Sequence, residues 1–400
     1  MKGPRIKIAV MIARLGPYHV ARMRALGHAV GAGETLALEI AAENREYGWA
    51  PVASDGFQRL TLITDADYQD TTSRVRASRT VDALEQMMPD YVAISGWGFA
   101  EARAAVGWCR REGRVAIVMS DSQERDEPRT KWKEIVKQQV VHAFDSAFVS
   151  GGSHARYLER LGMGADRITL GYDTVDNAHF HVGSERARAN EVRNREQFKL
   201  PERYFVSCAR FIEKKNLFRL LDAFAAYRHG APAQPWDLVL MGDGPLRADL
   251  EAKRAALGLS SSVHFVGFRQ YDDLPVFYGL ARAFILASTS EQWGLVVNEA
   301  MAAGLPVLVS EACGAAEELV FDGQNGFKFS PLDVRRLAEL LGQMSAPSTD
   351  LASMRRRSTE IVADWSPNRF AEGMLEAMRL GERHRDRRRP EIIPNVFLWV

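Results

Sequence analysis

The sequence predicts an α/β protein built from two doubly wound domains that face each other across a cleft. Three observations support this prediction. Short apolar runs alternate with amphipathic stretches in the first half of the chain. A polar stretch at residues 177–200 interrupts the alternation, which then starts again. A length of 400 residues also suits two hydrophobic cores better than one.

The first half contains four apolar runs with the length and composition of buried parallel strands. They are residues 6–12, 91–97, 115–120 and 146–151. Two stretches between them, residues 20–30 and 101–113, have the spacing of amphipathic helices. This alternation indicates a Rossmann-like layer, and we assign residues 1–180 to the first domain.

The polar stretch that follows has mixed charge and no clear apolar period, so we place the connection between the domains at residues 181–200. The second domain is expected at residues 201–365. Its predicted strands are residues 204–211, 237–244, 263–268, 281–288 and 305–310, and its predicted helices are residues 216–228, 245–258 and 295–304.

The end of the chain, residues 366–400, forms a separate segment. It opens with a predicted helix that has Ser366 as its N-cap and Pro367 at its first position. An arginine-rich cluster follows at residues 383–389. Such a cluster is usually solvated, and the alternative is contact with anionic lipid at the inner face of the membrane.

The composition argues against several classes of protein. The formal net charge is only +1, so we expect no nucleic-acid partner. Cys109, Cys208 and Cys313 form no CxxC pair, which favours a reducing compartment and argues against a zinc site. The first apolar run is too short to span a bilayer and no cleavage site follows it. We therefore expect a cytoplasmic protein.

The stretch "STSEQWGLVVNEAMAAGLPV", residues 288–307, contains the first candidate site. Glu291 falls in the turn between a predicted strand and a predicted helix, and Glu299 falls inside that helix. Gly294 and Leu295 open the helix, where unpaired N–H groups can bind an anion. A carboxylate beside an anion site can accept hydrogen bonds from sugar hydroxyls, so the stretch predicts a sugar–phosphate ligand.

Other candidates also follow predicted strands, where open α/β sheets bind their ligands. Arg210 and Lys215 come after the strand at 204–211, and two cations there suit a diphosphate. Gly242 lies in the "MGDGP" turn, and Gly16 lies in the "RLGPYH" turn before a helix. Glycine at such turns lets the backbone approach a ligand closely.

With these residues in place, the chain resembles the retaining glycosyltransferases of family 4, which have the GT-B fold. The resemblance spans roughly residues 200–335. It rests on the segments "CARFIEKKNLFRLLDAF", "LVLMGDGPLRADL", "VHFVGF", "ASTSEQWGLVVNEAMAAGLPVLVS" and "CGAAEELVFDGQNGFKFSPLD". It implies that the last helix crosses back to pack on the first domain.

The resemblance implies transfer of a glycosyl group from a nucleotide-diphosphate sugar to an acceptor hydroxyl, with retention of configuration. The implied donor is of the UDP or GDP type, and no metal or other cofactor is expected. The implied acceptor is a saccharide or a lipid-linked molecule in bacterial polysaccharide, glycolipid or glycoconjugate biosynthesis.

The resemblance also implies roles for single residues. Glu291, the first acid of an E-x7-E pattern, would bind hydroxyls of the donor sugar, and Glu299, the second acid, would bind the ribose. Arg210 and Lys215 would neutralise the departing diphosphate. The remaining donor contacts would come from the backbone of Gly294 and Leu295, from Phe268 and Arg269 at the nucleobase, and from Gly16 at the distal phosphate.

The acceptor side departs from the family pattern. Many members carry a histidine near the reacting carbon, whereas residues 118–134 contain none. Ser120, Asp121 or Ser122 are candidates for its place. His19 is another candidate, although a lone histidine at the start of a helix is more often structural.

Other functions are also consistent with some of these residues. The acids of "TDAD", Asp65 and Asp67, are expected to be a loop pair and no metal site. Two carboxylates also suit a glycoside hydrolase. A nucleotide-sugar epimerase on the same scaffold and a non-catalytic nucleotide-sugar-binding module stay open. A dehydrogenase is disfavoured because no GxGxxG follows the first strand.

Overall fold

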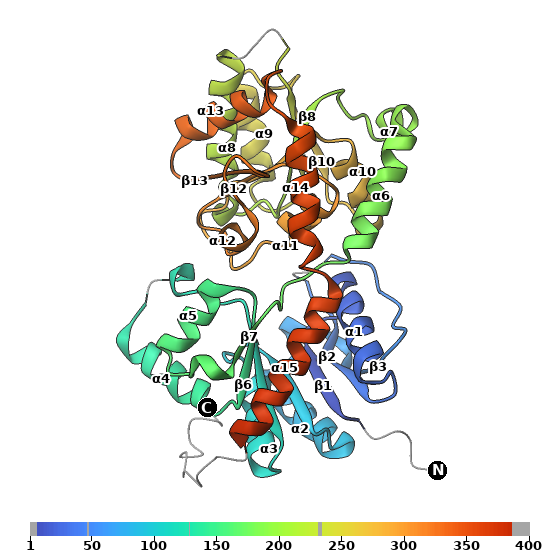
Figure 1. Cartoon of the computed structure of the whole chain (residues 1–400), viewed down its shortest axis with the longest axis vertical. Helices are drawn as coiled ribbons and strands as arrows, with labels where there is room; N and C mark the ends of the chain where they lie inside the picture. Colours follow the sequence, from blue (N-terminus) through green and yellow to red (C-terminus); the bar gives the residue numbers. More distant parts are fainter. Residues whose placement is uncertain (1–5, 46–47, 128, 231–233, 386–400) are drawn as a thin grey trace. The chain divides into compact units, whose positions relative to one another are not determined.

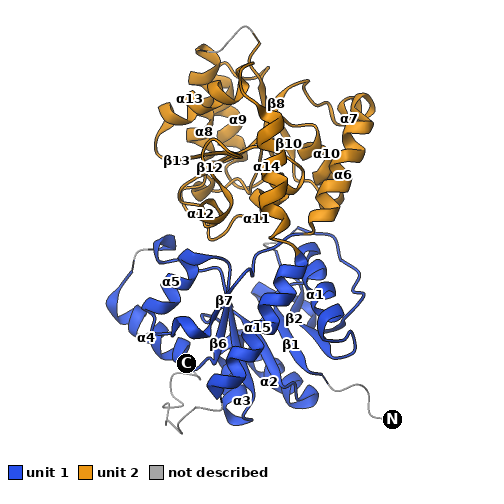
Figure 2. Cartoon of the chain, in the orientation of Figure 1, with its two compact units in different colours: residues 1–175, 367–400 blue, residues 176–366 orange. Residues whose placement is uncertain are grey.

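The chain divides into two compact units, each with its own parallel sheet (Figures 1 and 2). A computed structural model describes residues 6–45, 48–127, 129–230 and 234–385. Unit 1 comprises residues 1–175 and 367–400, and unit 2 comprises residues 176–366. The predicted class, two Rossmann-like α/β domains, is confirmed.

Unit 1 contains a seven-stranded sheet in the order β3-β2-β1-β4-β5-β6-β7. Its strands are β1 (Ile8–Ile12), β2 (Thr35–Glu43), β3 (Gln58–Asp67), β4 (Tyr91–Ser95), β5 (Val115–Ser120), β6 (Ser146–Val149) and β7 (Ile168–Leu170). Its helices are α1 (Pro17–Val30), α2 (Ser73–Met87), α3 (Ala100–Arg111), α4 (Lys131–His142), α5 (Gly152–Arg160) and α15 (Pro367–Arg385).

Helices cover both faces of this sheet (Figure 1). Alternate residues of β1 divide between two cores, because side chains of a strand point to opposite faces. Ile8, Val10 and Ile12 join the core under α1 and α15, while Ala9 and Met11 join the core on the other face. α15 begins at Pro367, as predicted, and packs against α1 and strands β5 to β7 of unit 1.

Unit 2 contains a six-stranded sheet in the order β10-β9-β8-β11-β12-β13. Its strands are β8 (Tyr204–Cys208), β9 (Asp237–Met241), β10 (Val263–Gly267), β11 (Ala283–Leu286), β12 (Val307–Ser310) and β13 (Gly326–Phe329). Its helices are α6 (Asn177–Ala189), α7 (Glu191–Phe198), α8 (Leu217–His229), α9 (Arg247–Ala256), α10 (Leu274–Gly279), α11 (Leu295–Ala302), α12 (Ala315–Leu319), α13 (Val334–Ser345) and α14 (Leu351–Ala363).

The connection between the units differs from the one predicted. Unit 2 begins at residue 176, and the stretch assigned to a connection at 181–200 forms most of α6 and α7. α6 buries Phe180, Ser184 and Ala187, which recur at helical spacing and pack toward α10 and α11. Only one narrow face of α6 is buried, and most of its residues are polar. The apolar residues are therefore too few to show a helical period in the sequence.

Two further expectations concern charged segments. The acids of "TDAD" are not in a loop, because Asp65 and Asp67 belong to the end of β3. Asp67 then accepts a hydrogen bond from the Gln69 N–H at 2.9 Å and caps the short 3-10 helix that follows. In the arginine-rich cluster, Arg383 and Arg385 end α15, and residues 386–389 lie outside the described residues. Within the described ranges, no helix is both long and apolar enough to cross a membrane.

Candidate functional site

Lys215 and Glu291 form an ion pair at the carboxyl-end edge of the unit 2 sheet. Lys215 ends the short 3-10 helix Glu213–Lys215 after β8, and Glu291 follows β11, which is the neighbour of β8 in the sheet. Both side chains are 13% exposed. The Ser288 hydroxyl also donates to Glu291 Oε2 at 3.1 Å. Two predicted site residues far apart in the sequence therefore meet.

The backbone around Glu291 is held by the segment that follows β12. The Glu291 N–H donates to Ala312 O at 3.2 Å, and the Gly314 N–H donates to Glu291 O at 3.0 Å. Gly294 has a φ of 97°, and a Cβ there would lie 2.9 Å from Cys313 Sγ. The positive φ and the close contact both require glycine at position 294, which is the N-cap of α11. The helix itself begins at Leu295. The first N–H groups of α11 thus follow directly on the Glu291 loop.

Glu299 lies apart from this surface. It is fully buried inside α11, and the Tyr278 hydroxyl donates to its Oε2 at 2.7 Å. Burial, with the charge of Glu299 adding to it, raises the pKa of the neighbouring Cys208 thiol to about 12. The two acids of the E-x7-E pattern thus occupy different environments, one at the edge of the site and one in the core.

Arg210 and Gly242 lie where two neighbouring strands end. Arg210 follows β8 and is exposed. Gly242 follows β9 with a φ of 128°, and a Cβ there would come within 1.9 Å of Ala209 O. The Gly242 N–H donates to Gly267 O at 2.9 Å, which ties the turn to the end of β10. Any side chain at Gly242 would push the Arg210 segment out of place.

The two residues expected at the nucleobase differ from each other. Phe268 is 45% exposed just after β10. Arg269 is half-buried, and its guanidinium carbon lies 5.0 Å from the ring centre of Phe277 and 5.7 Å from that of Phe198. Arg269 therefore stabilises the packing of α7 and α10, whereas the ring of Phe268 is accessible.

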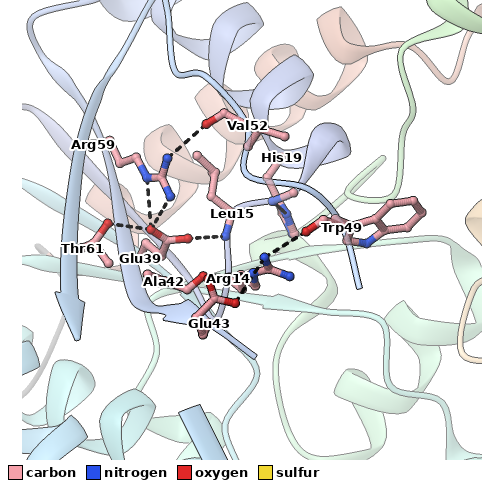
Figure 3. Close-up of polar contacts among 11 residues, drawn as sticks. Arg14, Leu15, His19, Glu39, Ala42, Glu43, Trp49, Val52, Arg59 and Thr61 are labelled. Carbon is pink, nitrogen blue, oxygen red and sulfur yellow. Dashed lines mark hydrogen bonds and ion pairs between the residues drawn. The ribbon is translucent and has the colours of Figure 1, made fainter. Parts of the chain in front are cut away.

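In unit 1, the turn between β1 and α1 is fixed by the buried carboxylate of Glu39 (Figure 3). Glu39 accepts hydrogen bonds from the Leu15 N–H at 2.7 Å, from the Thr61 hydroxyl at 2.6 Å, and from Arg59 at 2.7 and 3.0 Å. A buried charge needs such a full set of partners. These bonds join β2, β3 and the turn.

Arg14 secures the other side of the same turn (Figure 3). Its guanidinium donates to Ala42 O at 3.0 Å and to Trp49 O at 2.9 Å. The Gly16 N–H, at the start of α1, donates to His19 Nδ1 at 3.1 Å. Burial, with the charge of Arg22, lowers the pKa of His19 to about 3. His19 is therefore a neutral acceptor at physiological pH and holds the turn in place.

A second acidic group lies where β5 and β7 end. Arg22 forms an ion pair with Asp173 at 3.2 Å, and Ser150 Oγ donates to the other oxygen of Asp173 at 2.5 Å. Burial, with the charge of Asp173, raises the pKa of Asp121 to about 7. Ser120 is buried, and its Oγ accepts a hydrogen bond from the Ser122 N–H at 3.1 Å. Of the acceptor-side candidates, Asp121 has the environment of a group that exchanges a proton near neutral pH.

Comparison with known proteins identifies the second unit. Residues 189–360 match the family model described as glycosyl transferases group 1. This region therefore resembles the glycosyl transferases of group 1. The resemblance predicted from the sequence is confirmed.

Two relatives illustrate the similarity. The D-inositol 3-phosphate glycosyltransferase of Salinispora tropica is 31% identical over 262 residues, which cover 63% of this chain and 54% of the relative. The alpha-D-kanosaminyltransferase of Streptomyces kanamyceticus is 27% identical over 240 residues, which cover 59% of this chain and 58% of the relative. The matched part is thus little more than half the length of these curated relatives.

Solved structures extend the similarity to the whole fold. HepE of Anabaena, in complex with UDP and glucose, has a TM-score of 0.72 at 17% identity and covers 94% of this chain and 100% of its own. Sucrose-phosphate synthase of Thermosynechococcus elongatus has a TM-score of 0.72 at 19% identity and covers 94% and 98%. These matches show that both units together have the GT-B fold.

Some residues around these sites were missed in the sequence. Glu39 is a lone acid in the apolar run "TLALEIAAE", and that isolation was a usable signal. No such signal marks Tyr278, Asp173 or Arg22. Tyr278 binds Glu299, and Arg22 binds Asp173, so each interaction joins residues that are distant in the sequence. Among the described residues, no group of three or more His, Cys, Asp or Glu side chains could hold a metal ion.

Proposed function

We propose that the protein is a retaining glycosyltransferase that moves a sugar from a nucleoside-diphosphate sugar to an acceptor hydroxyl. The observation that carries the proposal is the Lys215–Glu291 ion pair beside the start of α11. It combines a cation, a carboxylate and helix N–H groups at one place. This combination suits a ligand with both phosphate and hydroxyl groups.

The proposed chemistry follows from the charge that develops during transfer. The bond between the anomeric carbon and the diphosphate breaks, a bond to the acceptor oxygen forms on the same face, and the acceptor proton leaves with the phosphate. Negative charge grows on the diphosphate, and Lys215, Arg210 and the N–H groups of α11 stabilise it. These residues carry the function of a metal ion, so the proposed reaction is metal-independent.

The other donor contacts have defined places in this scheme. Glu291 binds hydroxyls of the donor sugar, Phe268 contacts the nucleobase, and Gly16 offers its backbone to the distal phosphate. Glu299 binds the ribose once its hydrogen bond from the Tyr278 hydroxyl has broken, which frees Oε2 to accept from the ligand. We assign Asp121 to the acceptor side because its carboxyl group titrates near neutral pH.

Similar proteins suggest the class of donor and acceptor. HepE is solved with UDP and glucose, and one relative is a D-inositol 3-phosphate glycosyltransferase. We infer a UDP- or GDP-linked hexose as donor and a polyol, saccharide or lipid-linked acceptor. We further infer that the protein works in the cytoplasm, with peripheral contact to the membrane.

A thermal-shift screen with UDP, GDP and their sugars tests the proposal, because a bound donor raises the unfolding midpoint by mass action. NMR of the product then gives its anomeric configuration, and EDTA tests metal independence. A screen in which no nucleotide sugar changes the midpoint would overturn the proposal. Conversion of donor alone into an isomer would replace it with an epimerase, and binding without turnover would replace it with a binding module.

A further inference from the structure

Three arginines gather at the far end of α11, away from the donor site. Arg188 comes from α6, Arg282 directly precedes β11, and Arg355 lies in α14, which packs on α11 (Figure 1). Since Arg282 comes before β11 and Glu291 comes after it, the cluster lies at the opposite edge of the same sheet. An eight-residue helix is roughly 12 Å long, so the two places are well separated.

Two of the arginines bind the carbonyl groups that end α11. Arg188 Nη2 donates to Ala303 O at 2.5 Å, and Arg355 Nε donates to Gly304 O at 2.9 Å. Carbonyl groups after the last turn have no partner within the helix, and the helix dipole favours cations there. Capping of α11 therefore accounts for Arg188 and Arg355.

The third arginine is not explained by capping. The side chain of Arg282 is half-buried, and within the described residues its guanidinium makes no hydrogen bond or ion pair. Its Nε is shielded from solvent without a partner, as is the Nε of Arg188. A buried donor without an acceptor costs about 1–3 kcal/mol, so a native protein normally supplies an acceptor.

The charges around the cluster do not balance. Glu185 acts on Arg355 and forms an ion pair with Arg188 at 2.5 Å. Within the described ranges, neither Arg282 nor Arg355 forms an ion pair, so two positive charges have no paired carboxylate. Burial, followed by the charges of Arg188 and Arg282, lowers the pKa of Arg355 to about 10. Burial is the larger cause of this shift, and the two neighbouring arginines add to it.

We propose that Arg188, Arg282 and Arg355 form a second binding site, for a phosphate-bearing anion. A phosphate dianion would match the two uncompensated charges, and guanidinium forks bind phosphate oxygens in pairs. The ligand is either a free phosphate compound or the headgroup of a phospholipid. The site lies entirely within unit 2 and shares no residue with the donor site.

The test compares unfolding midpoints in inorganic phosphate and in chloride at equal ionic strength. We expect phosphate at tenfold its Kd to raise the wild-type midpoint by about 2–4 °C. Arg282→Gln should lose most of this rise, while Arg356→Gln should keep it. Arg356 is the matched control because it neighbours Arg355 on α14 and its side chain is 72% exposed.

The same variants separate ligand binding from a structural role. In phosphate-free buffer, Arg282→Gln should be at least as stable as the wild type, because it relieves repulsion. A large loss of stability there, or an undiminished phosphate response, would overturn the proposal. Lys215→Met controls for the donor site and should keep the response. If the response disappears in Lys215→Met and survives in Arg282→Gln, phosphate binds at the donor site and the proposal fails.

Cosedimentation with vesicles distinguishes the two sources of phosphate. Vesicles that contain phosphatidic acid are compared with neutral phosphatidylcholine vesicles, using wild type, Arg282→Gln and Arg356→Gln. Binding to the acidic vesicles that Arg282→Gln alone removes assigns the site to a lipid headgroup. A phosphate response without such binding assigns it to a soluble phosphate compound.

Discussion

Lys215 is the residue on which the proposed donor site depends most directly, because its ammonium group pairs with Glu291 beside the start of α11. We expect Lys215→Ala to lower the transfer rate about 10²–10³-fold, as removal of one such stabilising group typically does. Lys214→Ala is the control, since only the backbone oxygen of Lys214 contacts the Glu291 loop, at 2.8 Å from the Thr289 nitrogen. A rate within twofold of wild type for Lys215→Ala would contradict the assigned role.

Asp121 should make the stability of unit 1 depend on pH. Its pKa in the folded protein is about 7, against an ordinary value of 3.8, so the folded state holds a proton that the unfolded state has lost. Stability should therefore fall as pH rises from about 4 to 7. Asp121→Asn should remove this dependence and stabilise unit 1 at pH 8 by on the order of 1–3 kcal/mol.

Urea unfolding at several pH values measures this effect. Asp166→Asn, at an exposed position of unit 1, is the control and should keep the wild-type pH profile. A profile for Asp121→Asn that matches the wild type would show that Asp121 is ionised in the folded protein.

At the scale of residues, the sequence predicted single groups better than their partners. Lys215, Glu291 and Gly294 were predicted because they lie in the segments between strands and helices and match a family pattern, and the structure brings Lys215 and Glu291 together. The grouping of Asp121 with Arg22 and Asp173 was not found, because these residues come from three separate elements. No local spacing relates them, and only the folded sheet brings them together.

Among the elements, the link between β2, β3 and the first turn depends on Glu39 (Figure 3). We expect Glu39→Gln to destabilise unit 1 by about 3–5 kcal/mol, because it leaves the charge of Arg59 without its partner. Glu43→Gln is the matched control on the same strand. Its carboxylate lies 3.7 Å from Arg14 and is 66% exposed, so its loss should cost less than about 1 kcal/mol. Equal losses in urea unfolding would show that Glu39 is not the anchor.

The missed elements share a physical cause. β7 and β13 have three and four residues, too few to show a period. β3 lies at the edge of its sheet, where one side is exposed and charged residues are tolerated. β2 is buried over most of its length, but Glu39 interrupts its apolar pattern. Central strands such as β5 and β8 were predicted well, because burial on both faces makes them continuously apolar.

In the whole molecule, the last helix completes the core of the first unit. Met374 of α15 is fully buried with Phe148 and Phe370. We expect Met374→Ala to destabilise unit 1 by about 2–5 kcal/mol, because it leaves a cavity. The loss should appear in the unfolding transition of unit 1, while the transition of unit 2 and its response to UDP should not change.

Val75→Ala is the control, since Val75 belongs to unit 1 and is 40% exposed. If Met374→Ala destabilised unit 2 and left unit 1 unaffected, the assignment of α15 would be wrong.

The return of α15 to unit 1 has a consequence for the order of events during synthesis. During synthesis, unit 2 is complete once residue 366 has emerged from the ribosome. α15, which unit 1 needs to complete its core, emerges only afterwards. The later-encoded unit can therefore fold first, although domains usually fold in the order of translation. Before α15 emerges, the apolar sheet face that it will cover is exposed to solvent. We expect a nascent chain in that state to bind a chaperone.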